Sequence, residues 1–183
     1  TTEIYTLSLH DALPISLLHD IGHGPFSHQI EPIIAGDHNE HGLRCLDDMR
    51  GELRRCGVDS EALAAMMQGK DPLAQLVSDR NLGTDKLDYL MRDALHIGFT
   101  GVPDIEKIQF YTAFDGDVLA IEEKFIEEIK RLQKYYSYLH QHGYLNKTAL
   151  TVQRVLQRAV QEELAARGAA PGHLWRMTDE ELT

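Results

Sequence analysis

The chain has 183 residues, of which 43% are hydrophobic and 26% charged, and its formal net charge is −11. This composition is that of an ordinary globular protein with one sizeable core, and the length argues against a second full domain. No run of about 20 apolar residues occurs, so the sequence contains no predicted membrane span. The negative charge argues against a protein that coats nucleic acid without sequence preference, because such binding needs a basic surface. An anionic substrate stays compatible with it where a metal ion and a few local cations supply a positive field.

The two cysteines, Cys45 and Cys56, lie in ordinary sequence without a CxxC spacing, and no secretory signal is visible. Two reduced thiols are the interpretation that this pattern favours. We therefore expect a cytoplasmic protein.

The first fifteen residues, TTEIYTLSLHDALPI, match one reading frame of a widely used short-read sequencing adapter at every position. We therefore expect residues 1–15 to be foreign to the native protein and exclude them from fold prediction. On this interpretation residues 16–183 form a single domain that is truncated at both ends. The His10–Asp11 pair is then a decoy created by the adapter.

From Ser16 onward the sequence is mostly helical in pattern. Ser16–Asp20 has the pattern of the last turn of a helix, which two glycines and a proline then end. Apolar spacing and capping residues predict further helices over His38–Arg55, over Glu61–Gln68 with Ser60 as N-cap, after Asp71 and Pro72, over Asp85–His96 with Thr84 as N-cap, over Ile121–Leu139, over Thr148–Ala166, and after Thr178.

One segment has a strong strand pattern. Ile108–Phe114 is rich in β-forming residues, and an Asp-Gly turn separates it from the apolar run Val118–Ile121. The sequence therefore predicts a mainly α fold with one small β-hairpin near residues 108–121.

The segment from His19 to His28, HDIGHGPFSH, places three histidines and an acid within ten residues. An isolated histidine at the end of a helix most often has no function. Adjacent His19 and Asp20, however, can both reach one divalent ion when the backbone holds them side by side, and the glycines let the turn come close. Imidazole and carboxylate together suit a borderline transition metal, whose open positions admit water and phosphate oxygens.

A second polar pattern follows in the run GTDKLDYLMRD, residues 83–93. Helical spacing puts Asp85, Tyr89, Arg92 and His96 on one face and Leu87, Leu90, Met91 and Ala94 on the other. A solvated helix face with ordinary salt bridges is the alternative interpretation.

The two motifs together resemble the signature of the HD superfamily, in the form carried by SAM-and-HD-domain dNTP triphosphohydrolases and their bacterial dGTPase-like relatives. The resemblance covers nearly everything after Ser16 and implies an HD-domain helical bundle. It implies that His19, Asp20 and Asp85 bind the metal together with a further, upstream histidine.

The resemblance also assigns roles to the second motif. It implies that Lys86 contacts the substrate phosphates, that Tyr89 packs on the deoxyribose and that Asp93 meets the sugar 3′-hydroxyl. Arg92 is a further candidate for substrate binding, with a structural role as the alternative.

Four residues are candidates for acid–base chemistry or phosphate contact: His23 and His28 in the first motif, and Glu31 and His38 shortly after it. A bound metal would lower the pKa of a water molecule. The resemblance implies that this water attacks the α-phosphorus, so the leaving 5′-oxygen then needs a proton. His28 or His38 is a suitable acid, with Glu31 available to orient the imidazole. His23 is expected to line the phosphate pocket, where Mg²⁺ could bridge the triphosphate.

Other aromatic and histidine residues are expected to be structural. We interpret His41 and His140 as bystanders, and Tyr136 and Tyr144 as packing residues. Asn146 stands where relatives often have a histidine.

The leading hypothesis is hydrolysis of deoxynucleoside triphosphates to deoxynucleoside and triphosphate, dependent on Mn, Fe, Ni, Co or Mg. The second motif favours it by adding a phosphate-binding cation and a sugar-stacking ring to the metal ligand. The alternatives are an HD phosphohydrolase acting on nucleoside monophosphates, alarmones or cyclic nucleotides, a nucleotide sensor without turnover, and a structural helical module. The resemblance implies a homo-oligomer at full length. Because the upstream ligand is missing, we expect weak metal binding and little turnover from the chain as it stands.

Overall fold

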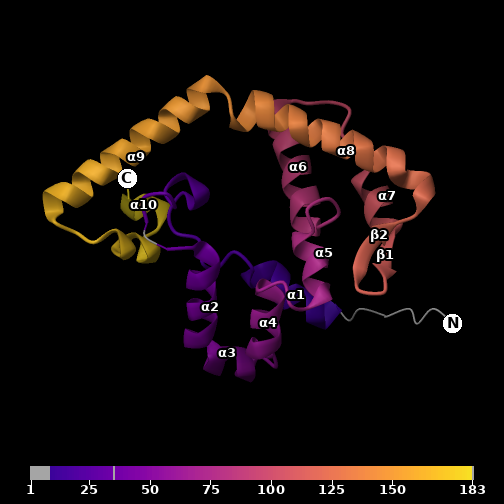
Figure 1. The fold of residues 1–183 in the computed structure, drawn as a ribbon, viewed down its shortest axis with the longest axis horizontal. Coiled ribbons are helices and arrows are strands. Elements are labelled where there is room, and N and C mark those ends of the chain that lie inside the picture. Colours follow the sequence, from indigo (N-terminus) through magenta and orange to yellow (C-terminus); the bar gives the residue numbers. More distant parts are fainter. Residues whose placement is uncertain (1–8, 35, 183) are drawn as a thin grey trace.

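The computed structural model describes residues 9–34 and 36–182, with side chains from residue 13 onward. The predicted decoy at His10–Asp11 lies outside the described side chains, and the adapter interpretation of residues 1–15 stays a prediction. The described chain is mainly helical with a single two-stranded antiparallel sheet (Figure 1), which confirms the predicted fold class. The elements are α1 (Leu9–Leu18), α2 (His38–Asp48), α3 (Arg50–Arg55), α4 (Ser60–Met67), α5 (Gln75–Ser78), α6 (Thr84–Ile97), α7 (Ile105–Phe110), β1 (Thr112–Asp115), β2 (Val118–Ile121), α8 (Ile126–Leu139), α9 (Lys147–Arg167) and α10 (Asp179–Leu182).

Helices α8 and α9 form a long arch over the remaining elements, and a π-helical turn, His140–Tyr144, joins them (Figure 1). Helix α6 reaches this arch from below, and α7 with the hairpin lies under α8. The chain after α9 turns back beneath it, toward the loop that follows α1. The loop that follows α1 and the C-terminal residues therefore lie side by side.

Three hydrophobic clusters hold these elements together. The first packs α6, α7, β2 and α8 around Leu90, Ile108 and Leu132. The second joins α1 to α2–α5 through residues that include Ile15 and Leu46. The third fixes the 26–34 loop to α9 and the C-terminal segment, through Ile30, Ile34, Val160, Leu174 and Trp175. Burial of such side chains supplies most of the stability of the fold.

Helix α6 shows the predicted amphipathic pattern with one exception. Leu87, Leu90 and Ala94 are buried, whereas Met91 is 42% exposed. The buried stripe is therefore narrower than the spacing suggested. None of the described helices is long and apolar enough to cross a membrane.

The hairpin is shorter than predicted, because residues 108–110 are helical. The Asp104 side chain accepts a hydrogen bond from the Lys107 backbone N–H at 3.0 Å and starts α7. Ile105 and Ile108 then lie one helical turn apart and are both buried. The N-cap and this spacing outweigh the β-propensity of the segment. Strand β1 begins at Thr112, opposite Ile121.

Several predicted helix boundaries also need correction. The expected helix over His38–Arg55 breaks at Met49, which separates α2 from α3. Asp59 and not Ser60 caps α4, since its carboxylate accepts from the backbone N–H groups of the next turn. Helix α6 begins after Gly83 without a side-chain cap, so Thr84 is its first residue and not its cap.

Helix α8 begins only at Ile126, after a 3-10 turn. Asn146 caps α9 by accepting from the Ala149 backbone N–H at 2.9 Å, which gives this asparagine a structural role. The predicted caps at Asp71 and Thr178 are confirmed, the second through a hydrogen bond from the Thr178 N–H to Glu181 at 2.8 Å.

The loop after α1 passes very close to α2. A Cβ on Gly22 would lie 2.0 Å from the carbonyl oxygen of His38 and 2.4 Å from the backbone nitrogen of Gly42. These are backbone atoms, which cannot move aside without shifting the helix. Only glycine fits at this position.

We predict that Gly22→Ala lowers the free energy of unfolding by about 3 kcal/mol, because overpacking against rigid backbone is costly. Gly51→Ala in exposed α3 is the matched control, since a Cβ there meets nothing within 4 Å. That variant should be neutral or more stable by up to about 1 kcal/mol. Urea unfolding of both variants measures the difference, and equal stabilities would contradict the close contact.

Candidate active site

The three predicted metal ligands converge from two distant elements. His19 follows the C-terminal end of α1, where its backbone N–H donates to the Ile15 carbonyl at 2.9 Å. Asp85 lies in the first turn of α6. His19 Nε2 is 3.3 Å from an Asp20 oxygen and 3.9 Å from an Asp85 oxygen. One donor atom from each of the three residues therefore lies within 4.8 Å of the others.

The state of His19 fits a metal ligand. Its Nδ1 lies 3.2 Å from the Ser16 carbonyl oxygen, and the tautomer that donates there leaves a lone pair on Nε2. Nε2 is itself buried and makes no hydrogen bond to the described residues. A buried nitrogen lone pair facing two carboxylates suits a divalent ion, with the carbonyl contact fixing the ring as metal-binding histidines require.

Beside this trio, Glu31 holds two histidines. Its Oε2 is 2.9 Å from His28 Nδ1, and its Oε1 is 2.6 Å from His38 Nδ1. The His38 backbone N–H also donates to Oε1, at 3.2 Å. Burial alone would raise the pKa of Glu31, but the hydrogen bonds from His38 and His28 outweigh it and lower the pKa to about 2. Glu31 is therefore ionised and orients both rings.

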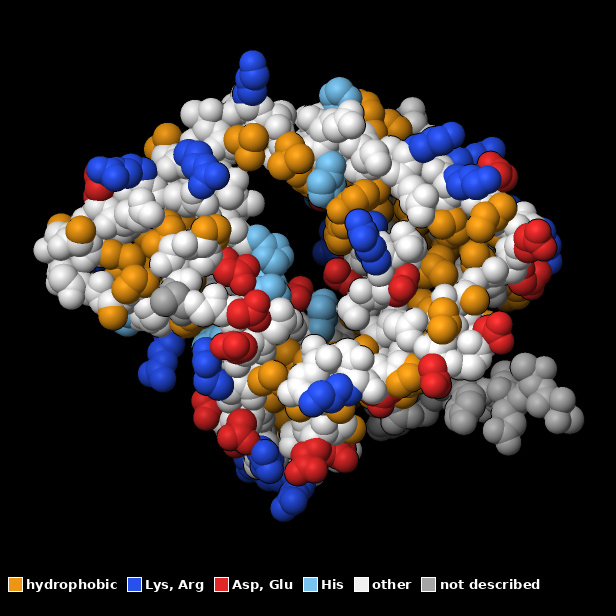
Figure 2. Space-filling view, in the orientation of Figure 1, with side chains coloured by type: hydrophobic (Ala, Val, Ile, Leu, Met, Phe, Trp, Pro, Cys, Tyr) orange, Lys and Arg blue, Asp and Glu red, His pale blue; other side chains and the backbone are white. Residues whose placement is uncertain are grey.

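His23 connects the two groups. Its ring stacks on His38 with centroids 4.2 Å apart and meets His28 edge-on at 4.6 Å. Its Nε2 lies 3.6 Å from the Asp20 oxygen that faces away from His19. Burial, together with the charge of neighbouring His38, lowers the pKa of His23, which favours the neutral ring at pH 7. Figure 2 shows histidine side chains, flanked by acidic ones, around the central opening of the molecule.

The predicted substrate residues of α6 have local partners. Lys86 donates to the Arg80 carbonyl oxygen at 2.8 Å and lies 3.6 Å above the centroid of the Tyr136 ring. Burial lowers the pKa of Lys86 and raises that of Tyr89 to about 12. Arg92 is exposed, pairs with Asp88 on its own helix and is not brought into the site.

Two tyrosines that the sequence pattern assigned to packing also make polar contacts near the predicted substrate residues of α6. Tyr144 donates from its hydroxyl to the Asp93 carboxylate, and burial and this bond raise the pKa of the phenol. The Tyr136 hydroxyl lies 3.1 Å from His140 Nε2. Tyr136, His140 and Tyr144 are spaced four residues apart along α8 and the π-helical turn. This spacing places them on one helical face and could have indicated the cluster from the sequence.

His41, predicted to be a bystander, has a structural role. Its Nδ1 donates to the Gly22 carbonyl oxygen at 3.0 Å, and its ring stacks on Trp175 with centroids 4.7 Å apart. It therefore links the C-terminal segment to the loop that carries the metal-ligand candidates.

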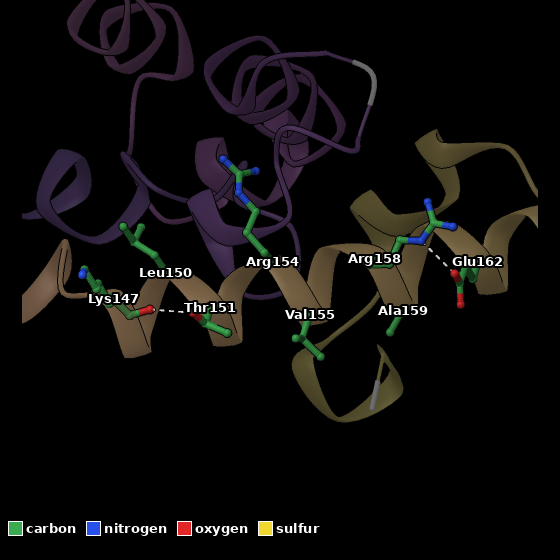
Figure 3. A pocket seen from close by; sticks show the side chains of 8 residues that line it. All are labelled: Lys147, Leu150, Thr151, Arg154, Val155, Arg158, Ala159 and Glu162. Atoms are coloured by element: carbon green, nitrogen blue, oxygen red, sulfur yellow. Dashed lines mark hydrogen bonds and ion pairs between the residues drawn. The ribbon is translucent and has the colours of Figure 1, made fainter.

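A concave surface runs along α9 (Figure 3) and is separate from the site described above. Its lining comes from one helix and consists of Lys147, Leu150, Thr151, Arg154, Val155, Arg158, Ala159 and Glu162. Within the part of the chain that the structure describes, sets of three or more metal-donor side chains occur at the two groups above and nowhere on α9.

Comparison with known proteins gives distant relatives. No protein-family model matches the chain. It is 28% identical to the uncharacterized protein YwfO of Bacillus subtilis, over 93% of this chain and 42% of that protein. It is 26% identical to a deoxynucleoside triphosphate triphosphohydrolase SAMHD1 homolog of Dictyostelium discoideum, over 80% of this chain and 32% of the relative. A putative HD domain-containing protein, L394 of Acanthamoeba polyphaga mimivirus, is 32% identical over 45% of this chain and 22% of its own length.

A solved structure shows the same fold. The crystal structure of a phosphohydrolase from Bacteroides thetaiotaomicron matches 97% of this chain with a TM-score of 0.71 and 28% identity, over 48% of the solved chain. The chain thus spans less than half the length of each of these relatives. It is similar to HD domain-containing proteins in sequence and to a phosphohydrolase in structure.

The depressed pKa of Glu31 predicts how stability depends on pH. A carboxyl group with a folded-state pKa of about 2, below its ordinary value of 4.5, stabilises the fold fully above pH 4.5. The contribution, on the order of 3 kcal/mol, is lost as the pH falls from 4.5 toward 2. We predict that the stability difference between the wild type and Glu31→Gln shrinks as the pH falls from 4.5 toward 2. Urea unfolding at each pH measures this difference. A difference that grows on acidification would contradict an ionised Glu31 that is stabilised by His38 and His28.

Proposed function

We propose that this chain carries the active site of an HD-type, metal-dependent phosphohydrolase that converts deoxynucleoside triphosphates to deoxynucleoside and triphosphate. One observation carries the proposal. His19, Asp20 and Asp85 converge from separate elements, directly beside a carboxylate that orients two histidines. A cation site adjoining a proton donor is the arrangement that phosphoester hydrolysis needs.

The comparisons support the general chemistry. Relatives in sequence are named as an HD domain-containing protein and as a deoxynucleoside triphosphate triphosphohydrolase homolog, and the structural relative is named as a phosphohydrolase. The choice of deoxynucleoside triphosphates over other phosphate esters rests on the second motif, where Lys86, Tyr89 and Asp93 share one helix with the ligand candidate Asp85.

His19, Asp20 and Asp85 would hold the divalent ion, and N/O ligation of this kind suits Mn, Fe, Ni, Co or Mg. When bound, such an ion lowers the pKa of water and neutralises phosphate charge. Asp20 and Asp85 are about half exposed, with side-chain exposures of 57% and 47%. The ligand atoms are therefore accessible to a substrate.

Of the two histidines on Glu31, the geometry favours His28 as the acid. His38 gives Glu31 Oε1 two hydrogen bonds, from its ring and from its backbone, and its side chain is only 21% exposed. His28 makes a single bond to Oε2 and is 68% exposed, so its Nε2 faces outward. His38 thus anchors the carboxylate, and His28 protonates the leaving 5′-oxygen.

The substrate would replace local contacts on α6. Lys86 would exchange the Arg80 carbonyl oxygen for a phosphate oxygen. Burial disfavours the ammonium form and lowers the pKa of Lys86, whereas a phosphate charge would favour that form. The half-buried Tyr89 ring offers a face for the deoxyribose. Asp93, already in a hydrogen bond with Tyr144, offers an acceptor for the sugar hydroxyl.

We predict that Asp85→Ala abolishes Mn²⁺ binding and triphosphate release together, because one of the three converging donors is lost. Asp88→Ala is the matched control, an exposed acid on the same helix that pairs with Arg92. Titration calorimetry with Mn²⁺ and release of triphosphate from each dNTP are measured on the chain as printed and on a longer version in which the sequence of the intact gene replaces residues 1–15. Unchanged metal affinity in Asp85→Ala would overturn the ligand assignment. A longer version that binds metal and releases no triphosphate would favour a nucleotide sensor.

Removing the acid should separate catalysis from metal binding. We predict that His28→Gln lowers kcat by about 10² to 10⁴ and leaves the Mn²⁺ affinity within about twofold, since general acid catalysis contributes a factor of this size. His96→Gln, on the exposed end of α6, should change neither quantity. A full-rate His28→Gln enzyme would transfer the role of acid to His38.

A further inference from the structure

The backbone before His28 takes a conformation that L residues rarely adopt. Phe26 has φ 52° and ψ 21°, and Ser27 has φ 45°. In the described part of the chain they are the two non-glycine residues with positive φ. Each costs on the order of 1 to 2 kcal/mol relative to a right-handed conformation. A surrounding contact must therefore hold the turn.

The contact at the left-handed residues themselves comes from the C-terminal end of the chain. The Phe26 backbone N–H donates to Asp179 Oδ1 at 2.7 Å, across 153 residues of sequence. Asp179 is the first residue of α10, whose first turn is fixed by the bonds from Thr178 to Glu181. The Phe26 side chain packs in the third hydrophobic cluster with Trp175. A hydrogen bond to a charged acceptor is among the stronger ones in proteins.

The direction of the chain at Phe26 and Ser27 decides where His28 points. His28 is the next residue, in the 3-10 turn Ser27–Gln29, and its ring reaches Glu31 at 2.9 Å. Relaxation of either φ to a negative value would rotate this turn and carry the ring away from the carboxylate. The local hydrogen bond from Ser27 N–H to the Gly24 carbonyl at 3.0 Å stays within the loop. From outside the loop, Gln157 Nε2 on α9 donates to the Gln29 carbonyl oxygen at 2.6 Å and fixes the end of the turn, whereas Asp179 holds its start.

We propose that Asp179 is a positioning residue: by holding the left-handed turn at Phe26 and Ser27, it aims His28 at Glu31. The geometric part of this inference stands on the contacts above, and its effect on rate rests on the proposed function. Nothing in the resemblance or in the sequence pattern pointed to Asp179, which was predicted only as part of a capped C-terminal helix.

The first test measures geometry without any activity. The pKa of Glu31 is followed by NMR of its ¹³C-labelled carboxyl group in the full chain. Asp179→Ala should raise this pKa by about one pH unit, because the hydrogen bond from His28 is lost. Asp179→Asn keeps a carbonyl acceptor for the Phe26 N–H and should leave the pKa near its wild-type value. Glu180→Ala, at the neighbouring exposed position, is the matched control and should also leave it unchanged.

A second-site variant tests the role of the strained turn. Ser27 is exposed, and glycine adopts its φ without strain. Ser27→Gly combined with Asp179→Ala should therefore return the pKa of Glu31 at least halfway to the wild-type value. This double variant and Asp179→Asn also keep the test valid if Asp179→Ala fails to fold.

The second test measures rate on the metal-loaded longer version, in which the sequence of the intact gene replaces residues 1–15. Asp179→Ala should lower kcat roughly ten- to a hundredfold with KM within about twofold, and Asp179→Asn should restore most of the loss. A folded Asp179→Ala protein with an unchanged Glu31 pKa would overturn the inference, as would equal effects of Asp179→Ala and Glu180→Ala. If no variant and no wild type hydrolyses a dNTP while the Glu31 pKa still responds to Asp179, the proposed function fails and the positioning role stands.

Discussion

The close contact between Gly22 and the first turn of α2 is the constraint on which the site depends. Because Gly22 has no side chain, the loop after α1 can lie directly against the backbone of His38 and Gly42. That approach brings the His23 ring onto the His38 ring, although the two residues belong to different elements. It also places the Gly22 carbonyl oxygen within hydrogen-bonding distance of His41, whose ring stacks on Trp175. A substituent at this one position would separate the loop from the helix and the histidines from one another.

Local patterns in the sequence were enough to predict most of the fold. Period and capping residues indicated the helices, and the caps at Asp71 and Thr178 lie where expected. The strand expected from Ile108 failed because β-propensity describes a fit to a pleated surface, whereas Asp104 and the buried pair Ile105 and Ile108 had already specified a helix. Such a conflict is decided by tertiary burial, which a single sequence does not reveal.

In the candidate site, too, some features could be predicted from local sequence and others could not. His19, Asp20 and Asp85 could be predicted because each lies in a short motif that resembles a known family signature, and the structure brings them together. The division of labour between His28 and His38 could not, since it depends on how many hydrogen bonds each gives to Glu31. The contact from Asp179 to Phe26 joins residues 153 positions apart, and no local period records it.

The two groups of the site have opposite electrostatic character, in a chain of net charge −11. Around His19, two carboxylates face one imidazole nitrogen, so this half of the site is acidic and favours a cation. Around Glu31, two imidazoles face one carboxylate, so the other half presents hydrogen-bond donors to an anion. Asp20 belongs to both, with one oxygen toward His19 and the other toward His23. A polyphosphate lying across Asp20 would therefore meet a cation at one end and the histidines on Glu31 at the other. Burial lowers the pKa of His23 between them, which weakens any competition of this ring with the metal for the phosphate.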